Sequence, residues 1–302
     1  MDDKSLDPSL DSEQTADKAE APSYTNKEAE TSAAEEKLEI KSLGDQIYAS
    51  LMHWRNFLFR VGEDLQLAYN AMDSQAGLIR AREEGAITIN YPLGQRADGS
   101  TITGQKDYER DLLINEYVRI VGYSVPVTGV YDLVIAVEAA IEDATRAILK
   151  EYPKKLKADK KIQASAAFEA KTIDELRANT VADILNGLAY KSPKDLAETL
   201  EKVFSFPLLE IPQFHRYVEV KATRDIHMHN RGTANDTYRR KADTMARVEA
   251  GEWLPVTIEY FLESHECCLK LVEVLVERFD SVWPSDLYRE YSANKASTEA
   301  NK

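Results

Sequence analysis

Cysteine is scarce in this chain: there are two, Cys267 and Cys268, and they are neighbours. Adjacent cysteines cannot readily bridge one another, so a disulfide framework is excluded and a reducing cytosol is expected. The first residues lack the basic and apolar regions of a signal peptide, and no window approaches the roughly eighteen uninterrupted apolar residues of a membrane span. We therefore expect a cytoplasmic protein without a membrane segment.

Several enzyme motifs are missing as well. The sequence has no G-x-x-x-x-G-K-S/T loop, no G-x-G-x-x-G after a strand, no H-E-x-x-H and no G-x-S-x-G. These motifs carry phosphate binding, dinucleotide binding, zinc proteolysis and serine hydrolysis. None of these four chemistries therefore has support in the sequence.

Positive charge is too low for a protein that coats nucleic acid, because the net charge is −14. The charge is uneven, however. Residues 1–40 hold twelve acidic residues and four lysines, a net −8, which leaves −6 for the rest of the chain. Eight lysine and arginine side chains gather with His215 in one stretch that is able to attract phosphate: His215, Arg216, Lys221, Arg224, Arg231, Arg239, Arg240, Lys241 and Arg247.

The pattern of apolar residues predicts an all-α protein with four regions. Residues 1–40 have almost no large apolar side chains, so we expect a disordered acidic tail. Residues 41–125 are expected to be helical, with a possible small β-hairpin at 86–104 around Asp98-Gly99. Residues 126–282 are expected to form a helical bundle, and residues 283–302 a polar C-terminal tail.

Apolar residues at three- and four-residue spacings, together with capping residues, place the helices. A long amphipathic helix is predicted from Leu43 to about Arg82, and a break at Pro126–Gly129. The other helices are predicted at Tyr108–Val121, Val130–Tyr152, 173–186, 193–204, from Pro212 to near Gly232, Asp236–Val248 and Pro255–Phe279. The lysine-rich connector at 154–161 is expected to be a solvated loop.

The end of the predicted helix at 212–232 holds the candidate site. The segment reads Arg224-Asp-Ile-His-Met-His-Asn-Arg-Gly232. Asp225 and His229 are four residues apart and share a helix face, whereas Arg224 and His229 are about 140° apart. Polar groups therefore occupy more than one side of this helix end. That divergence favours a site completed by a second subunit.

This segment resembles the R-x4-6-H motif of HEPN (higher eukaryotes and prokaryotes nucleotide-binding) domains, in particular RiboL-PSP-type proteins. The resemblance runs from about Tyr131 to Phe279, half of the chain. The stretches YDLVIAVEAAIEDATRAIL, YPKKL, YKSPKDLAETLEKVF and HNRG follow the family's order. It implies an up-and-down HEPN-like bundle whose motif-bearing helices meet in a homodimer.

The resemblance also implies a metal-independent endoribonuclease that needs no cofactor and cuts RNA by attack of the 2′-OH. Arg224 and His229 match the ends of the motif, and Asp225 matches its polar second position. We expect His229 to transfer a proton, Arg224 to stabilise phosphate and Asp225 to orient His229. His227, Asn230 and Arg231 are expected to contact substrate. Proteins of this kind commonly act as toxins or anti-phage effectors, which implies an antitoxin or regulatory partner.

Other interpretations stay open at this point. The chain is alternatively a catalytically inactive HEPN module that dimerises and binds a nucleotide, RNA or protein, or a scaffold built on its acidic tail and long apolar seams. His265, Cys267 and Cys268 suggest a metal cluster, but core packing is favoured because no second ligand pair is evident. Tyr238 lies nine residues beyond His229, so the chain departs from the R-x4-H-x-Y form, in which the tyrosine is modified.

Overall fold

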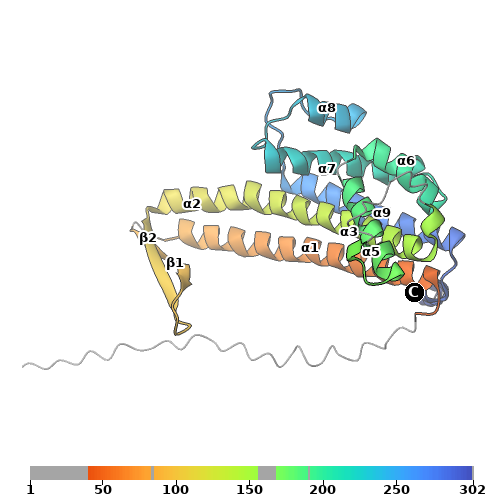
Figure 1. The fold of residues 1–302 in the computed structure, drawn as a ribbon. Helices are drawn as coiled ribbons and strands as arrows, with labels where there is room; N and C mark the ends of the chain where they lie inside the picture. Colours follow the sequence, from red (N-terminus) through yellow and green to blue (C-terminus); the bar gives the residue numbers. More distant parts are fainter. Residues whose placement is uncertain (1–39, 83–84, 156–167, 190, 301–302) are drawn as a thin grey trace, which may run out of the picture. The chain divides into compact units, whose positions relative to one another are not determined.

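Two long helical runs, joined by a hairpin, form the frame of the fold in the computed structural model (Figure 1). The structure describes residues 40–82, 85–155, 168–189 and 191–300. The expected disordered tail, except Ile40, lies outside these residues. The first run is α1 (Leu43–Arg80), and the second joins α2 (Arg110–Arg119) to α3 (Val125–Glu151). The two runs lie antiparallel and side by side.

Helix α1 begins at a capping box that also anchors the C-terminal part of the chain. The Ser42 hydroxyl accepts the Asp45 N–H at 3.0 Å, and the Asp45 carboxylate accepts the Ser42 N–H at 3.2 Å. Asp45 is buried and also accepts a hydrogen bond from the Ser285 hydroxyl at 2.8 Å. The start of α1 is thereby tied to the start of α10 (Asp286–Ala300).

The predicted break at Pro126–Gly129 is wrong, because the chain stays helical from Arg110 to Glu151. A π-helical segment, Ile120–Ser124, joins α2 to α3, and the Val125 N–H bonds to the carbonyl of Ile120. The wider turn gives room before Pro126, so the proline is accommodated without ending the helix. By length and composition alone this run is apolar enough to cross a membrane, a test that core helices of soluble proteins also pass; 44% of the apolar window is buried in the fold.

The predicted hairpin is present and slightly longer than expected. Strands β1 (Ile87–Gln95) and β2 (Thr101–Tyr108) pair antiparallel, with Ile87 opposite Tyr108. The turn between them places Gly99 at φ +83°, which glycine adopts without strain. The hairpin lies at the far end of α1 and α2, and most of its side chains are exposed (Figure 1).

The remaining helices pack around α3, except α8, which packs on α7. They are α5 (Ile173–Ala189), α6 (Pro193–Phe204), α7 (Pro212–His229), α8 (Asp236–Ala242) and α9 (Ile258–Val282). Helix α3 lies against α1, α9 and α7, and its inner positions, such as Leu133, Val137 and Ala140, are fully buried. The all-α fold with a small hairpin is therefore confirmed.

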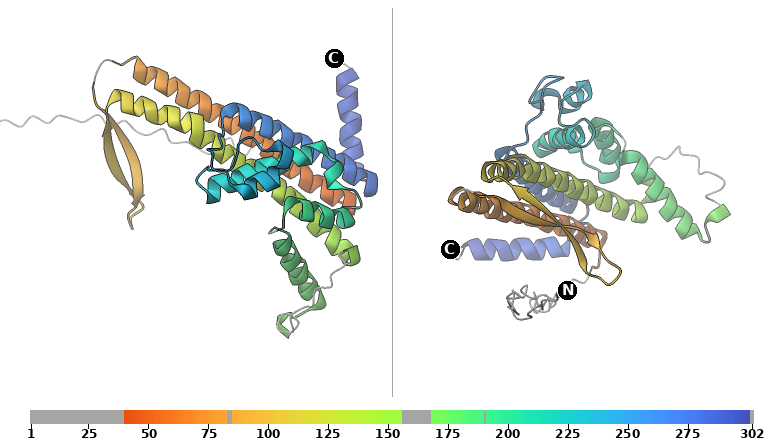
Figure 2. Two further views of the ribbon diagram at one scale, coloured as in Figure 1. Left: turned by 90° about the horizontal axis from the view of Figure 1, so that it is seen from above. Right: turned by 90° about the vertical axis from the view of Figure 1, so that its left-hand side faces the viewer.

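Toward the C-terminus, α9 lies three residues later than predicted at both ends, and the segments of α8 and α10 differ further from the predictions. Helix α8 ends at Ala242 rather than Val248, because Asp243 takes a left-handed φ of +48° and a short 3₁₀ turn follows. The stretch expected to be a polar tail forms α10 instead. The Ser285 hydroxyl caps this helix by accepting the Tyr288 N–H at 3.2 Å. Figure 2 shows α10 directed away from the other helices.

Candidate functional site

The candidate segment lies at the C-terminal end of α7, as predicted, and the helix ends at His229, three residues before Gly232. The N–H groups of Asn230 and Gly232 both bond to the carbonyl of Ile226, at 2.8 and 3.2 Å. Arg231 and Gly232 have φ values of +53° and +79°. Glycine is needed at 232, since a Cβ there would lie 2.4 Å from the Trp253 ring. The chain therefore turns sharply after His229.

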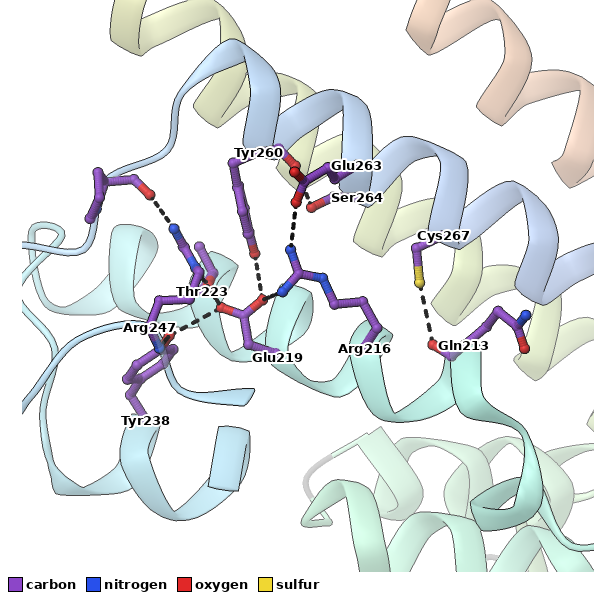
Figure 3. A network of polar contacts seen from close by, with 11 residues as sticks. Gln213, Arg216, Glu219, Thr223, Tyr238, Arg247, Tyr260, Glu263, Ser264 and Cys267 are labelled. Atoms are coloured by element: carbon purple, nitrogen blue, oxygen red, sulfur yellow. Dashed lines mark hydrogen bonds and ion pairs between the residues drawn. The ribbon is translucent and has the colours of Figure 1, made fainter. Parts of the chain in front are cut away.

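A buried carboxylate on α7 holds the segment that follows this turn (Figure 3). Glu219 is fully buried and receives hydrogen bonds and ion pairs from α7, α8, α9 and the segment after α8. Burial and the Glu219 charge raise the pKa of Tyr260, so its hydroxyl stays a donor. Four groups donate hydrogen bonds to Glu219: Thr223 Oγ1 at 2.8 Å, Tyr260 OH at 2.9 Å, Arg247 Nε at 3.0 Å and Tyr238 OH at 3.1 Å. Arg216 Nη1 forms an ion pair with it at 3.4 Å.

Arg224, the expected phosphate contact, is largely buried and salt-bridged within the chain. Its Nη2 lies 2.8 Å from Glu138 Oε2 of α3, and Lys221 also bonds to Glu138. Its Nε lies 3.4 Å from Asp225 Oδ1 but makes no hydrogen bond. Among the described residues, this Nε is the one buried side-chain nitrogen or oxygen without a hydrogen-bond partner. One N–H of the guanidinium is therefore left without a hydrogen bond, although it faces the Asp225 carboxylate.

Asp225 does not reach His229, which it was expected to orient. Its carboxylate accepts a hydrogen bond from Lys241 of α8 at 3.0 Å. Its other oxygen faces Arg224. Within one chain, Asp225 is therefore paired with cations on both sides. It is placed to position Arg224 rather than the histidine.

The two histidines of the segment lie in opposite environments. His229 is exposed at the last position of α7, and its imidazole makes no hydrogen bond to the described residues. His227 is 8% exposed, with Nε2 2.9 Å from the Leu254 carbonyl and Nδ1 3.4 Å from the Tyr123 hydroxyl. His227 is therefore able to contact a substrate only if the residues packed over it move away.

The cover over His227 comes from two distant parts of the chain. Tyr123 is on the π-helical segment, and Trp253 follows α8; both rings lie within 6 Å of the imidazole, centroid to centroid. An isolated β-bridge between Thr233 and Trp253 holds the segment after α8 against the end of α7. Burial lowers the pKa of His227, and the Leu254 hydrogen bond opposes this shift. A neutral imidazole that donates from Nε2 and accepts at Nδ1 fits these partners.

The two expected trailing residues differ in role. Asn230 is half-buried, and its amide donates to the carbonyl of Thr233, so it stabilises the turn after α7. Arg231 is exposed beside His229. Of this pair, only Arg231 is placed to meet a substrate on the surface.

The expectation that His265 and Cys268 pack in the core agrees with their surroundings. His265 Nε2 lies 2.8 Å from the Leu58 carbonyl, and Cys268 is fully buried. Burial raises the pKa of Cys267 to about 11, so this thiol stays protonated. Among the described residues, no group of three or more His, Cys, Asp and Glu is arranged to hold a metal ion.

Sequence reasoning missed Glu138, the residue that pairs with Arg224. Glu138 lies 86 residues before Arg224, and nothing in the helical pattern of α3 marks it. The same holds for Glu219, whose burial is unusual for an unmarked acidic residue on an amphipathic helix.

Comparison with known proteins shows no relative: no protein-family model, no curated protein and no solved structure matches this chain. The resemblance to HEPN domains therefore stays a prediction from the sequence motif.

Proposed function

We propose that this protein is a metal-independent endoribonuclease, with Arg224 and His229 as its catalytic residues. The proposal depends on one observation. The last two turns of α7 carry a guanidinium whose buried Nε lacks a hydrogen-bond partner and an exposed histidine that has no partner among the described residues. A guanidinium and an exposed imidazole thus lie at one helix end.

RNA is cut without a metal when its 2′-OH attacks the adjacent phosphate. The reaction needs a proton acceptor, a proton donor and a cation near the charged phosphorane. Histidine titrates in the required pH range, and the arginine fork suits phosphate oxygens. Because Arg224 and His229 are about 140° apart around the helix, a second subunit is proposed to complete the site. Asp225 acts as a positioning residue for Arg224.

The test is cleavage of a mixed-sequence RNA by the full chain in EDTA. Wild type is expected to leave 2′,3′-cyclic phosphate ends, and Arg224→Ala and His229→Ala to lose at least about 100-fold in rate. Arg278→Ala on α9 and His53→Ala on α1 are matched controls, because both side chains are exposed and lie on other helices. Full activity of either α7 variant contradicts the assignment of that residue.

A catalytically inactive binding module is the second candidate. It is favoured by the pairing of Arg224 with Glu138 and of Asp225 with Lys241, because neither side chain is free within one chain. For such a module, wild type would bind RNA in a filter or gel-shift assay and leave diverse RNAs uncut. A toxin or defence effector that a partner protein inhibits is compatible with both candidates, the ribonuclease and the binding module.

A further inference from the structure

An apolar cavity lies next to Arg224, and the proposed cleavage chemistry makes no use of it. It is bounded by α3, α5, α6 and α7 and has a volume of about 160 Å³. Its walls are mainly aliphatic and aromatic, and Lys221 and Glu138 lie on its lining. A cavity of roughly 150 Å³ with such walls is large enough to hold a benzene ring. The space therefore fits a single six-membered ring.

One polar group in the cavity lacks a partner. The Tyr217 side chain lines it and is 3% exposed, and its hydroxyl makes no hydrogen bond to the described residues. The hydroxyl oxygen is not one of the buried atoms that lack a partner, so it keeps accessible surface and is free to donate to a ligand. Burial, and then the charge of Glu138, raises the pKa of Tyr217 well above its usual range. The hydroxyl is therefore a donor, suited to a ring that carries a carbonyl oxygen.

Cationic groups continue from the cavity toward the helix end. Tyr217, Lys221 and Arg224 follow one another on α7 at spacings of four and three residues, so they share one face. The distance along the axis from Tyr217 to Arg224 is about 10 Å. Both cations contact Glu138, whose side chain is 37% exposed. A phosphate group is able to displace that carboxylate into solvent.

We propose that this cavity receives a single-ring base of an unpaired RNA strand, with Tyr217 donating to the base and Lys221 binding its phosphate. The next phosphate along the strand then lies at Arg224. The inference rests on RNA being the ligand of α7, and it adds a preference for uracil or cytosine at one position. Glu138 competes with the substrate for both cations.

Calorimetric titration of the full chain with uridine 5′-monophosphate tests the cavity without any cleavage. We expect binding at least about tenfold tighter than for adenosine 5′-monophosphate. Leu196→Trp, on the half-buried lip of the cavity, is expected to abolish binding. Tyr217→Phe is expected to weaken it about tenfold, whereas Tyr291→Phe on exposed α10 leaves it unchanged. Glu138→Gln is expected to strengthen binding of the nucleotide but not of uridine.

Unchanged binding in Leu196→Trp and Tyr217→Phe, or equal binding of the two nucleotides, overturns the proposal. Lack of nucleotide binding in wild type also overturns it, even when Arg224-dependent RNA cleavage is intact. Nucleotide binding that Leu196→Trp abolishes, with diverse RNAs left uncut, supports the cavity and contradicts the ribonuclease. If wild type cuts RNA, Leu196→Trp is expected to lose the preference for cutting beside pyrimidines. This result would show that the cavity binds a base of the RNA strand and not only a free nucleotide.

Discussion

His227 and His229 show how two identical residues on one helix acquire different environments. They are two positions apart, about 200° around the helix, so one faces inward and the other outward. His227 packs under Trp253 and bonds to Leu254, while His229 is exposed. The protonation state of His227 is therefore coupled to folding, which makes it a source of pH-dependent stability.

We expect that stability contribution to be lost in mild acid. Burial lowers the pKa of His227 in the folded state below the ordinary 6.5, so the unfolded chain binds the proton more readily. The contribution is full above pH 6.5 and decreases as the pH falls toward the folded-state pKa. We expect the difference in melting temperature between wild type and His227→Gln to decrease as the pH is lowered from 7.5 to 5.5. A difference in melting temperature that stays constant with pH contradicts this prediction. The control is His53→Gln, because His53 is exposed on α1.

The sequence predicted the position of this segment but not the cover over it. Polar residues before a glycine marked a helix end, and the helix does end within three residues of Gly232. Trp253 and Leu254, however, reach His227 only because the chain folds back along Thr233. Glu138 reaches Arg224 from another helix. Contacts between residues this far apart in sequence leave no periodic signal, so local patterns miss them.

At the scale of the helices, close approach of α1, α3 and α9 depends on Gly129. A Cβ at this position would lie 2.5 Å from both Leu65 of α1 and Phe261 of α9. Gly129→Ala gains about 1 kcal/mol in helix propensity, but overpacking a core costs about 1–3 kcal/mol. The variant is therefore expected to be less stable by about 1 kcal/mol.

Gly77 on α1 is the matched comparison, because a Cβ there meets no atom within 4 Å. Gly77→Ala is expected to stabilise the protein by about 0.5–1 kcal/mol. Urea unfolding of both variants measures the two effects. Stabilisation by both would show that α1, α3 and α9 do not approach as closely as the structure indicates.

The helices were predictable where one apolar stripe runs without interruption, as in α1 and α9. Predictions failed where local geometry departed from an ideal helix. Pro126 would end an α-helix, but the π-helical segment before it accommodates the ring. Helix α10 has little apolar periodicity; it begins because Ser285 caps it and Asp45 anchors it to α1.

At the scale of the whole molecule, we propose that a second copy covers the surface around Arg224. Ile135 of α3 and Met228 of α7 are 52% and 53% exposed. Met228 lies 3.8 Å from Arg224, sulfur to nitrogen, and Ile135 is one turn from Glu138 on α3. Large exposed apolar side chains beside a candidate site are typical of interaction surfaces. A symmetric pair would bring two α7 ends to one interface.

Mixing the two inactive variants tests whether such a pair shares its site. If Arg224 of one subunit works with His229 of the other, a mixed dimer of Arg224→Ala and His229→Ala keeps one complete site. With free exchange half of the dimers are mixed, so about a quarter of the wild-type activity should return. Each variant alone stays inactive, and differently tagged copies report whether exchange has occurred.

The alternatives give different results in the same experiment. A site contained in one chain cannot be restored by mixing, so an inactive mixture with proven exchange contradicts the shared site. Wild type that is monomeric by light scattering at micromolar concentration and still cuts RNA contradicts it more directly. Activity that rises with the square of protein concentration at high dilution would support it, because only the dimer then holds both groups at one phosphate.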